Sequence, residues 1–268
     1  MNVKKALLAS LIVSTASGCG GGKAVTAPVA VVVPPAPAPA PAPPPVQTTP
    51  LTGIFNGDLP PGRKFNGVVL ADGGLYGVYT AAGNAALVGG LVQGTGSSSN
   101  NMTYTSSSIK DFNAEGSGVR DASLSATYES NLRFNGTITY ALASVTPLNF
   151  TSSIFDASGA TAVSTMAGTY SGSYAEIPSG RSNLSVTLDG TGTWSATAAN
   201  GCKITGQISA VSKANVFNVS LAFGPAPCAF QGRALSGAAV FNASARVLTG
   251  GATSGDRASA VAFILTKQ

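Results

Sequence analysis

Residues 184–190 read Leu-Ser-Val-Thr-Leu-Asp-Gly, a pattern typical of one strand of a β-hairpin and the turn that follows it. Apolar Leu184, Val186 and Leu188 alternate with hydroxyl side chains, so an extended strand here has one apolar face and one polar face. Asp189-Gly190 follows at once and favours a tight turn, because Gly accepts a positive φ. The stretch therefore predicts an antiparallel hairpin with one face toward a core.

The same alternation returns along the rest of the chain. Apolar side chains recur at alternate positions in residues 217–223 and 261–265, and further turn dipeptides stand at Asp72-Gly73, Asn135-Gly136 and Asn200-Gly201. No segment predicts a helix of any length. We therefore expect an all-β fold of short antiparallel strands, either a small lipocalin-like barrel or a sandwich.

Landmarks recur within the globular part at an offset of roughly 115 residues, as expected for an internal duplication. Gly53-Ile-Phe55 is echoed by Gly168-Thr-Tyr170, and Tyr76 is echoed by Trp194. We expect both of these aromatic side chains to pack in a core, with a ligand cavity as the alternative. Each repeat is long enough to close an eight-stranded barrel. The expected tandem β-barrel domains are residues 51–160 and residues 161–268.

Composition excludes several classes of site. The 268 residues include no His, so the chain can form neither a Ser-His-Asp triad nor an imidazole metal site. The formal charge is +5, but the basic residues are scattered singly, which does not indicate a nucleic-acid-binding surface. We therefore expect no enzymatic activity, no catalytic or metal-binding residues, no cofactor and no nucleic-acid partner.

Three carboxylates are close together in sequence: Asp111, Glu115 and Asp121. Such a group could form an acidic pair for glycoside hydrolysis or a weak calcium loop. The spacing lacks the Asp-x-Asp-x-Asp-Gly pattern, so a solvated turn is the preferred interpretation. Asp72 and Asp189 are explained by their turn positions.

The first 50 residues differ in character from the rest. Lys4-Lys5 precede an apolar run at residues 6–13 that is too short to span a bilayer, and small residues then lead to a Cys. Residues 33–45 are almost entirely Pro and Ala, which favours a stiff polyproline II segment of roughly 40 Å. We predict a signal peptide at residues 1–18 and a disordered Pro-rich linker within residues 19–50.

The tail of this signal, Ala16-Ser17-Gly18-Cys19, resembles the lipobox of bacterial lipoprotein precursors. The resemblance implies cleavage before Cys19 and a diacylglycerol, with palmitate among its acyl chains, on that thiol. Gly rather than Asp at position 20 implies transfer to the outer membrane of a Gram-negative bacterium. An ordinary secretory signal ending in small residues is the alternative.

With Cys19 assigned to the lipid, Cys202 and Cys228 remain, and an even pair in an exported chain predicts a disulfide bond. A metal-binding pair is disfavoured, because zinc needs four ligands.

The plan of anchor, spacer and tandem Gly-rich β-domains resembles surface lipoproteins such as the transferrin-binding and factor H-binding families. The resemblance implies a non-enzymatic outer-membrane lipoprotein that binds a host or envelope macromolecule. It extends to no sequence motif, so no ligand-binding residue can be assigned. Two alternatives are a structural or assembly partner of another outer-membrane protein, and a carrier of a small apolar ligand in a barrel cavity.

Overall fold

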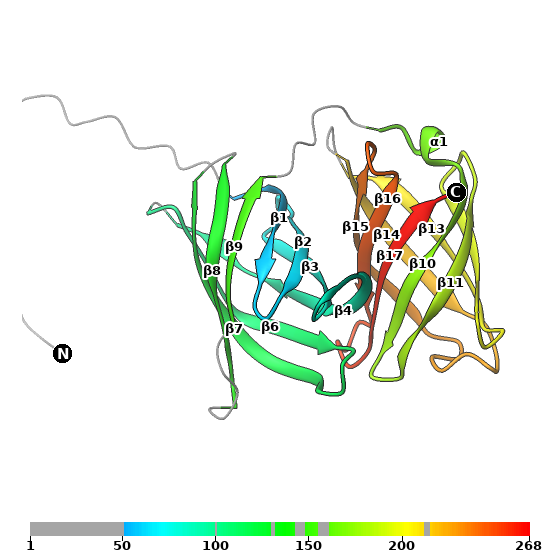
Figure 1. The fold of residues 1–268 in the computed structure, drawn as a ribbon, viewed down its shortest axis with the longest axis horizontal. Coiled ribbons are helices and arrows are strands. Elements are labelled where there is room, and N and C mark those ends of the chain that lie inside the picture. Colours follow the sequence, from blue (N-terminus) through cyan, green and yellow to red (C-terminus); the bar gives the residue numbers. More distant parts are fainter. Residues whose placement is uncertain (1–50, 100, 130–131, 143–147, 155–160, 212–214) are drawn as a thin grey trace, which may run out of the picture. The chain divides into compact units, whose positions relative to one another are not determined.

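The computed structural model describes residues 51–99, 101–129, 132–142, 148–154, 161–211 and 215–268. These residues form two closed antiparallel barrels with a single helical turn, which confirms the all-β prediction and selects the barrel over the sandwich (Figure 1). The predicted signal peptide at 1–18 and linker at 19–50 lie outside the described residues.

The first barrel is an up-and-down meander whose neighbouring strands are consecutive in the chain. Pairing of β1 with β9 and of β4 with β6 closes it, and the short β5 pairs with β6. Its strands are β1 (Gly53–Leu59), β2 (Arg63–Val69), β3 (Gly74–Ala81), β4 (Asn84–Thr95), β5 (Ser97–Ser98), β6 (Thr103–Asn113), β7 (Gly118–Glu129), β8 (Arg133–Tyr140) and β9 (Leu148–Ile154).

The second barrel repeats this meander and is closed by pairing of its first strand with its last. A single helical turn, α1 (Val163–Met166), precedes it. Its strands are β10 (Gly168–Ile177), β11 (Gly180–Leu188), β12 (Thr193–Ala198), β13 (Lys203–Ala210), β14 (Val216–Phe223), β15 (Ala234–Asn242), β16 (Val247–Thr253) and β17 (Ala260–Lys267).

Period-two alternation sets the inside and the outside of each barrel. In β12, Trp194, Ala196 and Ala198 are buried, while the side chains between them are exposed. The first barrel is filled around Phe134, whose ring lies 5.3 Å from Phe55. The domain limits at 160 and 161 stay a prediction, because residues 155–160 are outside the described part of the chain.

Elements of the chain itself close both ends of the second barrel. At one end, Met166 of α1 is fully buried, and the Tyr170 hydroxyl donates to the Met166 carbonyl over 2.6 Å. At the other end, the loop between β14 and β15 packs Phe230 against Phe223. The predicted disulfide between Cys202 and Cys228 is confirmed there, with an S–S distance of 1.97 Å, and it ties this loop to the start of β13.

Some strands are buried on both faces, because their outer faces pack against the other barrel. Apolar residues of β3, β4 and β6 form one cluster with residues of β10 and β17, and residues of β1 and β2 form another with β14 and β15. A buried hydrogen bond of 3.0 Å from the Val88 amide to the Ser173 hydroxyl oxygen crosses the first cluster. The two barrels therefore share a largely apolar interface.

The repeat is visible in the turns of the two barrels. The predicted match of Tyr76 with Trp194 was wrong by one residue. Gly73 and Gly192 have φ angles of 83° and 91°, and their carbonyls accept equivalent hydrogen bonds from the Gly96 and Ile208 amides. Trp194 pairs with Leu188 just as Leu75 pairs with Val69, so Trp194 corresponds to Leu75. Tyr76 instead packs at the interface between the barrels.

The predicted hairpin at Asn135-Gly136 was wrong, since both residues lie inside β8. Gly136 pairs with Ala126 of β7, and a Cβ at residue 136 would lie 2.5 Å from the Ala126 Cβ. This Gly therefore allows close approach of two strands, and the dipeptide does not mark a turn.

Candidate functional site

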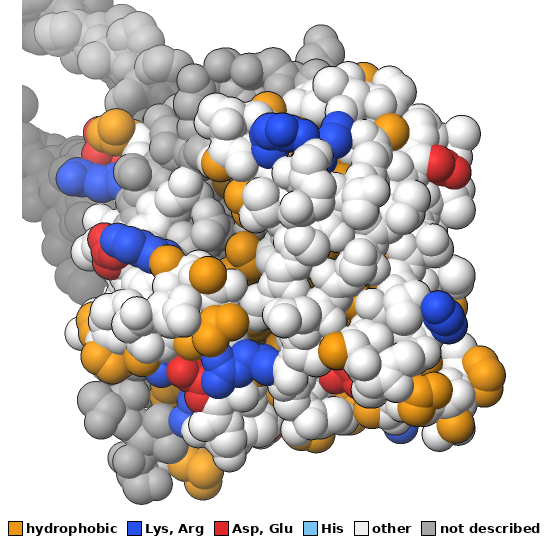
Figure 2. Space-filling model, turned by 45° about the vertical axis from the view of Figure 1, so that its right-hand side comes forward, with side chains coloured by type: hydrophobic (Ala, Val, Ile, Leu, Met, Phe, Trp, Pro, Cys, Tyr) orange, Lys and Arg blue, Asp and Glu red, His pale blue; other side chains and the backbone are white. Residues whose placement is uncertain are grey.

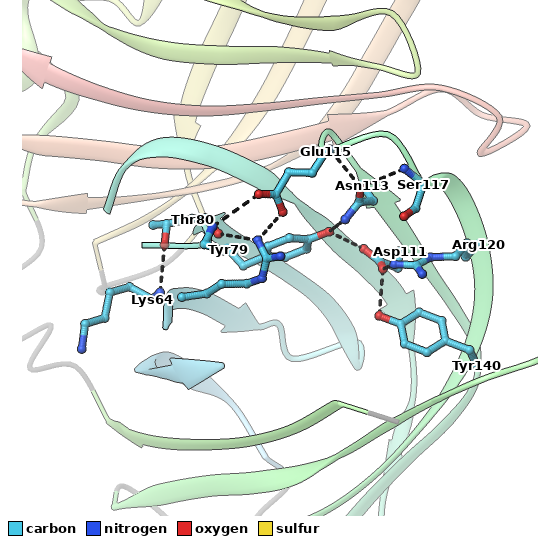
Figure 3. A network of polar contacts seen from close by, with 11 residues as sticks. Lys64, Tyr79, Thr80, Asp111, Asn113, Glu115, Ser117, Arg120 and Tyr140 are labelled. Atoms are coloured by element: carbon cyan, nitrogen blue, oxygen red, sulfur yellow. Dashed lines mark hydrogen bonds and ion pairs between the residues drawn. The ribbon is translucent and has the colours of Figure 1, made fainter. Parts of the chain in front are cut away.

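A buried network of polar side chains lies inside the first barrel near one end (Figure 3). Its members come from four strands: Tyr79 from β3, Asp111 and Asn113 from β6, Arg120 from β7, and Tyr140 from β8. Period two places Asp111 and Asn113 on the same face of β6 as Ile109, which belongs to the core. The strands therefore hold these polar groups where apolar residues would otherwise pack.

Asp111 is the centre of the network and is only 1% exposed. One carboxylate oxygen accepts a 2.7 Å hydrogen bond from the Tyr79 hydroxyl. The other accepts from the Tyr140 hydroxyl at 2.8 Å and from Arg120 at 2.9 Å. The Arg120 guanidinium also stacks over the Tyr140 ring, 4.5 Å from its centroid. The charge of Asp111 is thus compensated, and both of its oxygens are occupied.

The network continues to the rim of the barrel through Asn113 and Glu115. The Asn113 amide nitrogen donates to the Tyr79 hydroxyl at 3.1 Å, while its carbonyl oxygen accepts from two backbone amides of the β6–β7 turn. Glu115 pairs with Arg63, whose guanidinium donates to the Thr80 carbonyl at 3.2 Å. Side chains therefore tie together the hairpins β1–β2, β3–β4 and β6–β7.

The same environment alters the acidity of the two phenols. Burial is the main cause that raises the pKa of Tyr79 well above its ordinary value, and the negative charge of Asp111 adds to it. The pKa of Tyr140 is raised for the same two reasons, in the same order. Both phenols therefore stay protonated and act as hydrogen-bond donors to the carboxylate across the physiological range.

This arrangement corrects the expectation of a solvated turn. Asp111 is buried and ion-paired, while Asp121 lies on the outside of the barrel, 68% exposed, and pairs with Lys110 over 2.7 Å. The three carboxylates do not converge, and the described residues contain no group of three or more metal-binding side chains. The sequence signal was the period of two, which places Asp111 inward with Ile109 and Asp121 outward.

The geometry of the network matches a structural plug, by which we mean a buried polar cluster that fills one end of the barrel interior and joins its strands. A general acid or base needs a free oxygen within hydrogen-bond reach of a substrate, and both oxygens of Asp111 are engaged by partners within the barrel. What the arrangement can do is fix the hairpins at this end of the first barrel.

The second barrel contains a small apolar cavity. It measures about 20 Å³ and is bounded by inward side chains that include Trp194, Ile208 and Phe263. Trp194 is a core residue, 6% exposed, as expected from its place in the strand. A cavity of this size has room for about one water molecule, whereas small-molecule sites measure about 300–1,000 Å³. The interior of this barrel is therefore filled by its own side chains.

The face of the molecule shown in Figure 2 is mostly uncharged. On this face charged side chains are few, and wide uncharged areas separate them into small groups. Exposed Ser, Thr, Asn and Gln side chains line β11 to β14, for example Ser195, Thr205 and Asn218. The structure therefore shows no basic stripe on this face.

Cys19, the predicted lipid attachment site, lies outside the described residues.

Comparisons with known proteins found structural similarity of low degree. No family profile matches this chain, and no curated protein matches its sequence. One similar solved structure is a Bacteroides fragilis protein provisionally described as an outer membrane protein, 13% identical over 82% of this chain and 97% of that chain, with a TM-score of 0.25. A second is a mutant of transferrin-binding protein B, a vaccine antigen of Haemophilus parasuis, 10% identical over 79% of this chain and 64% of that chain, with a TM-score of 0.28. At these TM-scores neither likeness carries an argument about function.

Among the described residues, no helix is both long and apolar enough to cross a membrane.

Proposed function

We propose that this chain is a non-enzymatic outer-membrane lipoprotein, attached through a diacylglycerol on Cys19, whose barrels bind a macromolecular partner with their outer surfaces. The signal and lipobox-like sequence at residues 1–19 support the anchor. Each buried methylene of an acyl chain contributes about 0.8 kcal/mol, so several chains hold a protein at a bilayer. The linker at 19–50 would then act as a spacer, and 51–160 and 161–268 as the two displayed domains.

The filled interior of the second barrel is the observation that carries the binding mode. Because its cavity is about 20 Å³, a ligand of ordinary size has no place inside it. This disfavours the alternative of an apolar-ligand carrier for that barrel. In the first barrel the polar network occupies one end of the interior, with Asp111 at its centre. The outer surfaces remain as the contact region for a host or envelope partner.

The anchor is tested by metabolic labelling with a palmitate analogue in cells that express the full chain. Wild-type protein should incorporate the label and Cys19→Ala should not. The double variant Cys202→Ala/Cys228→Ala is the matched control and should still incorporate it, because those two cysteines form the disulfide. Equal labelling of the wild type and Cys19→Ala would overturn the anchor.

The binding mode is tested by photo-crosslinking in intact cells. A photoreactive amino acid is placed at outward positions Ser195, Thr205 and Asn218, each exposed in the structure. We expect one of these positions to yield a discrete crosslinked protein, and protease treatment of intact cells shows whether the barrels face outside. A host protein supports the leading form of the proposal, and an outer-membrane protein supports the assembly role. Absence of any crosslink, with a small apolar molecule copurifying instead, would refute surface binding.

A further inference from the structure

The closure of the first barrel between β4 and β6 is short, as is its other closure between β1 and β9. Only four residue pairs join β4 to β6, from Gly90↔Asn113 to Gln93↔Lys110. On its other side, β6 pairs with β7 over nine residue pairs, with an irregularity between Ser106 and Ile109. We term the junction between β4 and β6 the seam. Because fewer residue pairs join β4 to β6 than join β6 to β7, the seam is a place where the barrel can open.

Side chains bridge the gap between the β4–β6 ladder and the short β5–β6 ladder that follows it. The hydroxyls of Ser106 and Ser108, on β6, both donate to the Thr95 carbonyl of β4, at 2.6 and 3.2 Å. These bonds join the two strands beyond Gln93, in the region of the β6 irregularity.

The second barrel supplies two further bonds across the seam. Arg257, in the hairpin between β16 and β17, donates from one guanidinium nitrogen, Nη2, to the Gln93 carbonyl at 2.8 Å and to the Ser108 carbonyl at 2.6 Å. Nη2 carries two N–H groups, so it can serve both strands at once. Hydrogen bonds from a charged donor are stronger than those between neutral groups.

The hairpin at 254–259 is built to project this side chain. Arg257 has φ 54°, a left-handed conformation that residues other than Gly rarely adopt. The turn is held by a 2.9 Å bond from the Arg257 amide to the Ser254 carbonyl and by a 3.0 Å bond from the Ala258 amide to the Asp256 carboxylate. A rare backbone conformation that is stabilised on several sides is a reason to look for a role of the residue it displays.

We infer that Arg257 is a latch between the barrels: the second barrel holds the β4–β6 seam of the first barrel shut. Closure of the first barrel is then coupled to docking of the second, and the seam is the segment that opens first when this contact is lost.

The latch is tested by hydrogen–deuterium exchange of the full chain. Arg257→Gln should speed exchange of the amides that bridge the seam, within 90–93 and 110–113, by about tenfold or more, the factor for one lost hydrogen bond to a charged group. The ladders of the second barrel should be unaffected. Arg246→Gln is the matched control: Arg246 also has a left-handed φ, 57°, in another hairpin of the second barrel, and it donates to the Gln268 carbonyl.

The outcomes separate the latch from a general contribution to stability. Equal seam exchange in Arg257→Gln and Arg246→Gln would overturn the inference, and so would a uniform increase over both barrels. Should Arg257→Gln not fold, Arg257→Lys keeps the positive charge while losing the planar donor, and it should show a smaller increase confined to the seam. Arg257→Gly removes the guanidinium and also relieves the strain of the left-handed φ, and it should open the seam as much as Arg257→Gln does.

Discussion

Replacement of Asp111 by Asn is the sharpest test of the buried network. Asn has nearly the same shape, so the change removes the negative charge that faces Arg120 and the two phenols. Asp111 is 1% exposed and the Arg120 side chain is 21% exposed. Removal of one partner from a buried ion pair costs about 3–5 kcal/mol, and partial exposure of Arg120 favours the lower limit of about 3 kcal/mol.

The effect can be measured by calorimetry and by urea unfolding of the purified protein. For a folded unit of this size, 1 kcal/mol corresponds to about 2–4 °C, so we expect Asp111→Asn to lower Tm by about 6–12 °C. Asp58→Asn is the control, because Asp58 and its partner Lys64 are 69% and 63% exposed and such a pair contributes about 0–1 kcal/mol.

A double variant separates the ion pair from the loss of a single side chain. Asp111→Asn combined with Arg120→Gln leaves no uncompensated charge, so its destabilisation should be smaller than the sum of the two single effects by at least about 1 kcal/mol. If Asp111→Asn destabilises the protein no more than Asp58→Asn does, the network is not a structural plug and the reasoning fails.

Three other predictions follow from the same structure. Because burial raises the pKa of Tyr79, the unfolded chain loses this proton from about pH 10 while the folded chain keeps it. The free energy of unfolding should therefore fall above pH 10, and it should fall less steeply with pH in Tyr79→Phe. Equal slopes of this free energy against pH in the two proteins would count against this account. Reduction of the Cys202–Cys228 disulfide should lower the free energy of unfolding by about 3–4 kcal/mol in urea titrations with and without reductant, and an unchanged midpoint would contradict the estimate. A Cβ at Gly251 would lie 2.7 Å from Leu91 of the first barrel, so Gly251→Val should cost about 1–3 kcal/mol in thermal unfolding; Gly255→Ala, with open space around it, should cost little, and similar losses in both would refute overpacking at the interface.

The alternation of residues accounts for most of what could be predicted about the fold. Leu184, Val186 and Leu188 are buried and the residues between them are exposed, as the period of two requires. The turn after Leu188 was predicted correctly because turn geometry is a local property, but its left-handed φ of 91° lies at Gly192 and not at Gly190. Asn135-Gly136 failed, because that Gly is needed where two strands approach closely, which depends on the partner strand.

The candidate site was less predictable for the same reason. Asp111 and Asp121 have the same chemistry and stand ten positions apart, yet one is buried and the other is 68% exposed. Only closure of the barrel brings Tyr79, Arg120 and Tyr140 to the buried carboxylate.

Sequence alone determined the strand pattern, the pairing of the two cysteines available for a disulfide, and the expectation of an anchored, two-barrel protein, because these depend on neighbouring residues or on residue counts. Tertiary structure alone decided that the second barrel is filled, that Tyr79, Arg120 and Tyr140 meet at Asp111, and that Arg257 reaches Gln93 and Ser108. Those features depend on contacts between residues up to 164 positions apart, and no local pattern in the chain specifies which distant groups will meet.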